Sequence, residues 1–324
     1  LSTSKMALQA ALESGRITED PTLTPELLAA FPETMQRRQG DAILQHRLRR
    51  EIIATKIANR FVNRLGITAA FTLAEEEGAS FGQVAAAFVA AERLFGMREF
   101  WERLDTADLP EQLRLELFDQ ASRALQLQIA DILRNMSASA KLAEIVDNLG
   151  PGLQALDAAV EGLLRREVAS EATDRRRRLI ELGAPDDIAA KIVRLFELNG
   201  GVGIAALSKR LDVDVIDLTN AYTRLGEALG LDWAQGAANR FQAKDQWERL
   251  LTAGLARDFE QLRLDFLHRK RGSDPGEAVD QWVAAQGPRV DQFRRVVERV
   301  RNAPATTAPM LAQIATQARV LLGR

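Results

Sequence analysis

The sequence predicts an all-α protein, a multi-helix bundle that contains two related helical subdomains. Apolar residues recur every three to four positions through most of the chain, which is the periodicity of amphipathic helices. No stretch shows sustained apolar–polar alternation or β-branched clusters joined by hairpin turns, so no strand is needed. With 324 residues and 46% apolar content, the chain is long enough for one large core or two smaller ones.

The individual helices follow from caps and breakers. Thr24-Pro25-Glu26 combines an N-cap with a first-turn Pro, Ser80 and Gln83 form a capping box, and Asp274-Pro275-x-Glu277 combines both signals. The helices expected before residue 140 cover 4–14, 24–31, 41–65, 67–77, 80–96 and 110–135. After a smaller helical region at 141–183, broken at Gly150-Pro151-Gly152, they cover 185–198, 204–211, 215–229, 245–270, 275–302 with a kink at Gly287-Pro288, and 310–322.

The stretch 41–96 is the centre of the prediction. Two apolar ridges lie on its first helix at four-residue spacing, and we expect both to be buried against other helices. The first ridge is Leu44, Leu48 and Ile52, and the second is Ile53, Ile57, Phe61 and Leu65. Asn59 and Asn63 lie between the ridges although Asn is a mediocre helix former, so something beyond helix propensity favours them there.

Three runs carry a resemblance to a known family. The first is His46-x-Leu48-Arg49-Arg50-Glu51-Ile52-Ile53-Ala54-Thr55, continued by Ala58-Asn59-Arg60-x-Val62-Asn63-Arg64-x-Gly66. The other two are LESGRITEDPTLTPELLAAFP at 12–32 and Gly226-Glu227-x-Leu229-Gly230-Leu231-Asp232-Trp233. In their order and spacing they resemble the C-terminal helical region of the large, bacterial-type NAD-specific glutamate dehydrogenases, and the likeness covers nearly the whole chain.

The resemblance implies a role without chemistry of its own. The full-length enzymes oxidatively deaminate glutamate to 2-oxoglutarate with NAD, but their active-site and dinucleotide-binding segments are not among these residues. We therefore expect no catalytic, cofactor-binding or metal-binding residue in this fragment, which looks like a piece cut from a longer protein. The implied partners are the catalytic domain of the same polypeptide and other subunits of a homo-oligomer, and the implied role is docking, assembly or regulation. The alternative is a free-standing α-helical scaffold that binds proteins.

The composition limits the classes of partner and of chemistry that the chain can have. Lys and Arg number 43 against 45 Asp and Glu, so the net charge of −2 gives no overall attraction to nucleic acid or anionic membranes. The chain has no cysteine, which excludes disulfides, thiolate metal sites and a cysteine nucleophile. No apolar run approaches the roughly 18 residues of a membrane span. We expect a cytoplasmic protein that binds neither nucleic acid nor membrane.

A weak internal repeat supports two subdomains. Shifted by 134 positions, residues 58–96 align without gaps on residues 192–230, and a Trp follows each copy, Trp101 and Trp233 respectively. Together with the break at 150–152, this alignment predicts subdomains at 1–140 and 141–324. Shared helical period and composition is the competing explanation for the same matches.

Two motifs each allow a ligand-binding interpretation and an ordinary structural one. Gly201-Val202-Gly203-Ile204-Ala205-Ala206 has the G-x-G-x-x-A form of a dinucleotide-binding turn, but the preceding residues 192–198 are helical instead of a strand, which favours a helix stop and a turn. Phosphates could bind to the arginine run Arg175 to Arg178, together with Arg165 and Arg166 upstream. Acidic residues at four-residue spacing favour a solvated charged face instead.

Two sets of residues remain as candidates for contacts. Asn59, Asn63 and Arg64 are either a polar network that fixes helix register or a contact with the catalytic domain. Large aromatic residues are typical anchors of interfaces and equally typical core residues, and five of them cluster where the shorter helices end. They are Phe95, Phe100, Trp101, Tyr222 and Trp233.

Overall fold

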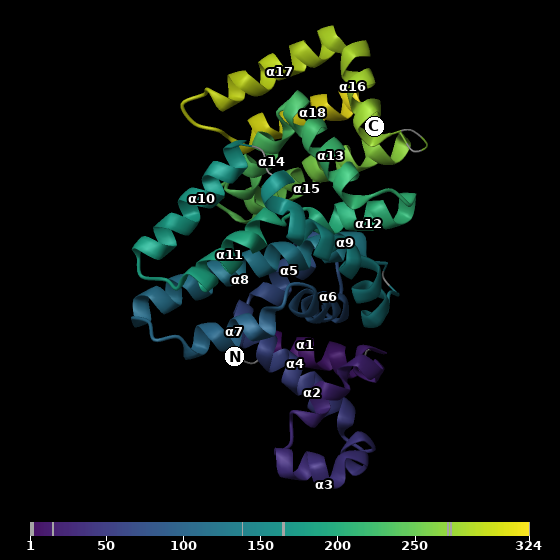
Figure 1. Cartoon of the computed structure of the whole chain (residues 1–324), viewed down its shortest axis with the longest axis vertical. Coiled ribbons are helices and arrows are strands. Elements are labelled where there is room, and N and C mark those ends of the chain that lie inside the picture. The colour runs from purple at the N-terminus through teal and green to yellow at the C-terminus, as the bar shows by residue number, and fades with distance from the viewer. Residues whose placement is uncertain are drawn as a thin grey trace. The chain divides into compact units, whose positions relative to one another are not determined.

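The computed structural model describes residues 3–14, 16–137, 139–163, 166–270, 272 and 274–323. Over these ranges the chain forms eighteen α-helices and two short 3-10 helices and no strand (Figure 1), which confirms the all-α prediction. No helix in the described ranges is long and apolar enough to cross a membrane. The chain divides into two compact units, which we call unit 1 (residues 1–160 and 166–202) and unit 2 (mainly residues 203–324). This division does not coincide with the expected boundary after residue 140, and the origin of the two halves by duplication stays a prediction.

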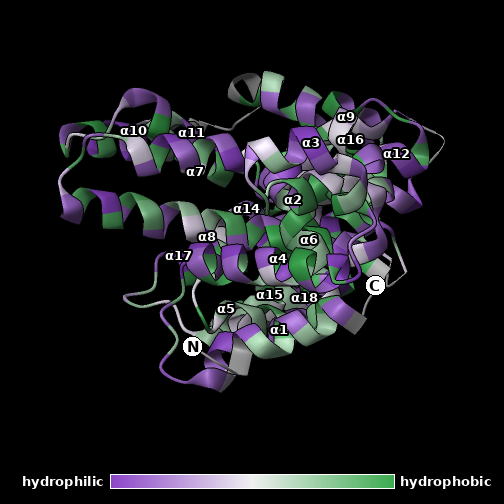
Figure 2. Ribbon diagram, turned by 90° about the horizontal axis from the view of Figure 1, so that it is seen from below, coloured by the Kyte–Doolittle hydropathy of each residue, from purple (hydrophilic) through white to green (hydrophobic). Residues whose placement is uncertain are grey.

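Unit 1 is built around α6, a helix that is buried on all sides along most of its length. The sequence of α6, FGQVAAAFVAAERL, is rich in Ala, which lets neighbouring helices approach closely, and Figure 2 shows its hydrophobic colouring. Helices α1, α4, α5, α7 and α8 pack against it. The α-helices of unit 1 are α1 (Thr3–Ser14), α2 (Thr24–Leu28), α3 (Glu33–Leu44), α4 (Arg49–Leu65), α5 (Ala69–Glu77), α6 (Phe81–Leu94), α7 (Met97–Thr106), α8 (Glu111–Asn135), α9 (Leu142–Leu163), α10 (Arg166–Glu181) and α11 (Asp186–Glu197). The 3-10 helices η1 (Arg16–Glu19) and η2 (Pro21–Leu23) join α1 to α2.

Unit 2 is built around α15, which packs against α13, α14 and α18. Its helices are α12 (Gly201–Leu211), which starts within unit 1, α13 (Val215–Leu229), α14 (Leu231–Asn239), α15 (Gln246–Arg269), α16 (Pro275–Ala285), α17 (Gly287–Arg301) and α18 (Ala308–Leu322). Of the expected caps, Ser80 with Gln83 is present at α6 and Asp274, with Pro275 in the first turn, is present at α16. Thr24 is the first residue of α2 and not its N-cap, so that expected cap is wrong. The Asp214 side chain in addition accepts from the backbone of α13.

The expected helix at 41–65 is wrong at its start. The chain turns at residues 45–48, and α4 begins only at Arg49. Consequently the two ridges differ. Ile53, Ile57, Phe61 and Leu65 are buried, as predicted, whereas Leu44 is 37% exposed and Leu48 is 43% exposed. Because the helical spacing of Leu44, Leu48 and Ile52 is broken by this turn, the first ridge does not join the core.

Two expected helix breaks also differ from the structure. The helix α9 runs through Gly150-Pro151-Gly152 without interruption. An interior Pro costs about 3 kcal/mol or more, but six apolar side chains of α9, Leu142, Ile145, Leu149, Leu153, Leu156 and Val160, are buried and hold the helix in place. The segment 275–302, expected as one kinked helix, is instead two helices that meet at Gln286.

Candidate functional site

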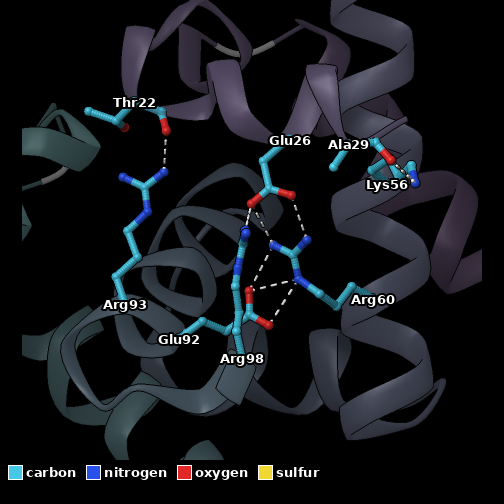
Figure 3. Close-up of polar contacts among 8 residues, drawn as sticks. All are labelled: Thr22, Glu26, Ala29, Lys56, Arg60, Glu92, Arg93 and Arg98. Atoms are coloured by element: carbon cyan, nitrogen blue, oxygen red, sulfur yellow. Dashed lines mark hydrogen bonds and ion pairs between the residues drawn. The ribbon is translucent and has the colours of Figure 1, made fainter. Parts of the chain in front are cut away.

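Unit 1 contains a cluster of four charged residues, each from a different helix, in which the two carboxylates are buried and the two arginines are partly exposed (Figure 3). The members of this four-residue ion cluster are Glu26 of α2, Arg60 of α4, Glu92 of α6 and Arg98 of α7. Arg60 Nε donates to both carboxylate oxygens of Glu92, at 2.9 and 2.8 Å, and its Nη1 and Nη2 donate to Glu26 at 2.8 and 3.2 Å. Arg98 forms an ion pair with the same Glu26 carboxylate.

The geometry of Arg60 explains how two carboxylates are held inside the unit. The side chains of Glu26 and Glu92 are only 5% and 1% exposed, so each needs a charged partner. The planar guanidinium presents its donors as a fork and serves both carboxylates at once. The cluster therefore joins α2 and α4 to the consecutive helices α6 and α7.

Two further contacts hold the segment around α2 in place (Figure 3). Arg93 Nη2 donates to the backbone oxygen of Thr22 at 2.6 Å, and Lys56 Nζ donates to the backbone oxygen of Ala29 at 3.2 Å. These bonds satisfy carbonyls on both sides of the short helix α2. The charges in this part of unit 1 are thus used to attach α2 to the bundle.

Burial raises the pKa of Glu92, because removing its carboxylate from water outweighs the attraction of Arg60, Arg64 and Arg93. A carboxyl group with a raised pKa binds its proton more tightly in the folded state. Its contribution to stability is therefore complete below the ordinary value of 4.5 and is lost as the pH rises through the raised value.

We therefore expect the free energy of unfolding of the wild type to fall, relative to that of Glu92→Gln, as the pH rises from 4.5. Urea titrations of both proteins between about pH 4 and pH 8 measure this difference. A difference that is constant with pH, or that grows in favour of the wild type as the pH rises, would show that burial does not dominate at Glu92.

Unit 2 contains a buried arginine, Arg263 of α15, whose side chain is 1% exposed. Its Nε donates to the backbone oxygen of Phe259 at 3.1 Å, and its two Nη atoms contact Asp232 and Gln235 of α14. The guanidinium carbon lies 3.9 Å from the centroid of the Tyr222 ring. Arg263 therefore links α13, α14 and α15.

The contacts of Arg263 explain why the motif at 226–233 contains two glycines. A Cβ atom on Gly226 would lie 2.3 Å from a carboxylate oxygen of Asp232, so only Gly leaves room for that carboxylate. Gly230 has φ of +70°, and a Cβ there would lie 2.9 Å from Val297. The glycines thus allow the chain to turn from α13 into α14 and place Asp232 against Arg263.

The G-x-G-x-x-A motif lies in a helix instead of a phosphate-binding turn. Gly201 to Ala206 belong to α12, and the turn with positive φ is at Gly200. The buried Asp131 carboxylate of α8 accepts from the backbone N–H of Val202 at 3.2 Å, which caps the positive end of α12. A carboxylate of the chain itself therefore occupies the position in which such a helix end binds a phosphate.

The arginine run is engaged with its own neighbours. Arg175 lies 4.0 Å from the centroid of the Phe196 ring, Arg176 pairs with Asp186 at 2.7 Å, and Arg177 pairs with Asp174 and Glu181. This is the solvated, charged face that the four-residue spacing predicts. Arg165 lies outside the described residues.

The Asn59, Asn63 and Arg64 stripe does not form a buried network. Asn59 is half-buried and Asn63 is exposed. Arg64 pairs with Asp105 at 2.6 Å and lies 5.0 Å from the centroid of the Trp101 ring, so it attaches α4 to α7. Contact of the two Asn side chains with a catalytic domain stays a prediction.

Four of the five candidate aromatic anchors are core residues. Phe95, Phe100, Trp101 and Tyr222 are buried, and Trp101 packs between Phe100 and Phe118 at centroid distances of 5.1 and 5.3 Å. Each of the four is at most 8% exposed, too little to anchor an interface. Only Trp233 is partly accessible. Burial of a large aromatic depends on helices that are far apart in sequence, which spacing alone does not reveal.

The sequence reasoning missed the charged pairs and one exposed aromatic. Glu92 ends an otherwise apolar run, and Arg263 lies among apolar residues of α15, which are signals of a buried charge that needs a partner. Trp247 at the start of α15 is 77% exposed, which helical periodicity does not reveal. In the described ranges, no group of three or more His, Asp or Glu side chains is placed to hold a metal ion.

The fold and these contacts define an all-helical domain whose buried charges join its helices. The sequence model of the family described as "Glutamate dehydrogenase, C-terminal" matches residues 1–319, and the chain belongs to this family. It is 27% identical over 319 residues to the NAD-specific glutamate dehydrogenase of Pseudomonas aeruginosa and 24% identical over 319 residues to that of Halomonas elongata, each alignment covering 96% of the chain. It is 25% identical over 333 residues to that of Mycobacterium tuberculosis, with 97% of the chain covered. The chain spans only 20% of the length of each of these relatives.

Proposed function

We propose that the chain is the non-catalytic C-terminal helical domain of an NAD-dependent glutamate dehydrogenase and that it serves docking, assembly or regulation of the full-length enzyme. The observation that carries this proposal is the family match over residues 1–319, combined with relatives of which the chain covers only 20%. The conversion of glutamate and NAD to 2-oxoglutarate and ammonium would then take place in the remainder of the polypeptide, which would also bind NAD.

The side-chain geometry supports a role without chemistry. A hydride-transfer site must position nicotinamide against its substrate and have ionisable groups available for proton transfer. Glu26, Glu92 and Asp131 are instead engaged with arginines or with a helix N-terminus of their own unit. The arginine run supports a protein partner over a nucleic acid. Arg175 to Arg177 are engaged with side chains of their own unit and are therefore poorly available to phosphates. We propose a cytoplasmic homo-oligomer without nucleic-acid or membrane partners.

The isolated chain is therefore expected to form no NADH from glutamate and NAD. Absorbance at the NADH band, recorded with the isolated chain and with the native enzyme at equal molar concentrations, checks this expectation. The native enzyme is the control for substrate and cofactor quality. Turnover by the isolated chain, lost on heat denaturation, would overturn the proposal that it is non-catalytic.

A further inference from the structure

The segment Pro32–Arg50, which we call the arm, comprises α3, the turn at residues 45–48 and the first two residues of α4. Figure 1 shows α3 projecting from the part of unit 1 formed by α2 and the start of α4. Although α3 has 12 residues, Ile43 is its only buried side chain. Among the helices, its substantial packing partner is α2, which has only five residues. The arm thus extends from unit 1 with few contacts to it.

A helix in this position lacks a source of stability. Isolated helices shorter than about 12 to 15 residues are marginal in water, and most helical stability in proteins comes from packing of an apolar face. The helix is also interrupted at Gln39, which has φ of −137° and ψ of 30°. A second surface that covers α3 would supply the missing packing.

The arm presents both apolar and basic groups to such a surface. Met35, Leu44 and Leu48 are 41%, 37% and 43% exposed, and two of them belong to the ridge that the sequence predicts to be buried. The arm contains five arginines and two carboxylates, a formal charge of +3 in a chain of net charge −2. Arg38, Arg47 and Arg49 make no ion pair within the described residues. The complementary surface therefore combines apolar contacts with carboxylates.

We propose that the arm docks onto an acidic, partly apolar surface of the remainder of the glutamate dehydrogenase polypeptide, an inference that rests on the proposed function. Two observations select this occupant. The relatives carry four times as much chain outside the matched region as within it, since the match covers 20% of their length. In a family described as C-terminal that remainder precedes the matched region, and α1, to which it would connect, packs against α4 in the unit that carries the arm. Covalent connection to this unit raises the effective concentration of the remainder at the arm.

Hydrogen exchange measured by mass spectrometry tests the docking. Backbone amides of residues 34–48 should exchange rapidly in the isolated chain and at least about tenfold more slowly in the native enzyme. The triple variant Met35→Gln, Leu44→Gln, Leu48→Gln of the native enzyme should lose this protection. The matched control, Leu115→Gln, Ile180→Gln, Leu182→Gln, changes three exposed apolar residues of the same unit and should keep it. All six side chains are exposed, so neither variant should unfold the unit.

Each other outcome has a defined meaning. Equal exchange of the arm in both proteins, with slower exchange of another surface of the chain in the native enzyme, would overturn docking through the arm and leave the proposed function in place. If no segment gains protection, both proposals are wrong. Protection in the isolated chain that rises with concentration would assign the arm to a second copy of this chain, and protection independent of concentration would show that α3 needs no partner. Either result would overturn the inference.

Discussion

Replacing Arg60 by Ala is expected to lower the free energy of unfolding of unit 1 by about 3 to 5 kcal/mol, the cost of removing one partner from a buried ion pair. The variant leaves the Glu92 carboxylate, which is 1% exposed, without its bidentate partner, and leaves Glu26 with Arg98 only. Urea unfolding measures the loss, and hydrogen exchange of α2, α4 and α6 locates it in unit 1.

The control for Arg60→Ala is Arg103→Ala. Arg103 pairs with Asp187 at 2.7 Å in the same unit, but both side chains are about half exposed. Such a pair contributes about 0 to 1 kcal/mol. Equal losses for the two variants would show that burial of the Glu26 and Glu92 carboxylates adds nothing to the cost of losing Arg60. Adding Glu92→Gln to Arg60→Ala should recover part of the loss, because it removes the uncompensated charge.

Arg263→Ala is expected to have an effect of similar size in unit 2, about 3 to 5 kcal/mol. Arg263 is fully enclosed and contacts Asp232, Gln235, the Phe259 carbonyl and the Tyr222 ring, so the variant removes contacts among three helices. The matched control is Arg224→Ala, which breaks an exposed pair with Asp280 in the same unit. Urea unfolding should show a clearly larger loss of free energy for Arg263→Ala than for Arg224→Ala. A loss below about 1 kcal/mol for Arg263→Ala would contradict its role as the buried link among the three helices.

Gly226→Ala tests the same Asp232–Arg263 contact by displacing Asp232. The added Cβ would displace the Asp232 carboxylate, whereas Gly254→Ala in α15 meets its nearest atom only at 3.8 Å. We expect a loss of about 1 to 3 kcal/mol for Gly226→Ala and a small gain for Gly254→Ala, since Ala is the better helix former. The double variant Gly226→Ala, Arg263→Ala should lose less than the two single losses together, because both disrupt one interaction.

The features that could be predicted from the sequence are local ones. The caps at Ser80, Asp214 and Asp274 involve residues three positions apart or fewer, and the ridge from Ile53 to Leu65 lies on one helix. Local pattern and structure agree there because the same few residues decide both. The helix break predicted at Gly150-Pro151-Gly152 is absent, because burial of the leucines on both sides outweighs the local cost of Pro.

The ion contacts could not be predicted, because their partners are distant in sequence. Arg60 meets residues 34 and 32 positions away, and Arg263 meets a residue 31 positions away. Periodicity shows that Leu44 and Leu48 are apolar and suitably spaced, but not that the chain turns at residues 45–48 before α4 begins. The same limit applies to the aromatic residues, whose burial depends on which helices pack together.

We propose that this domain serves a glutamate dehydrogenase whose chemistry lies elsewhere in the polypeptide. Glutamate-dependent NADH formation by the native enzyme with and without the region that matches residues 1–319 tests it most directly. We predict that the shortened enzyme still binds NAD but turns over well below the native rate. A shortened enzyme that forms NADH at the native rate and keeps the native subunit assembly would contradict the account.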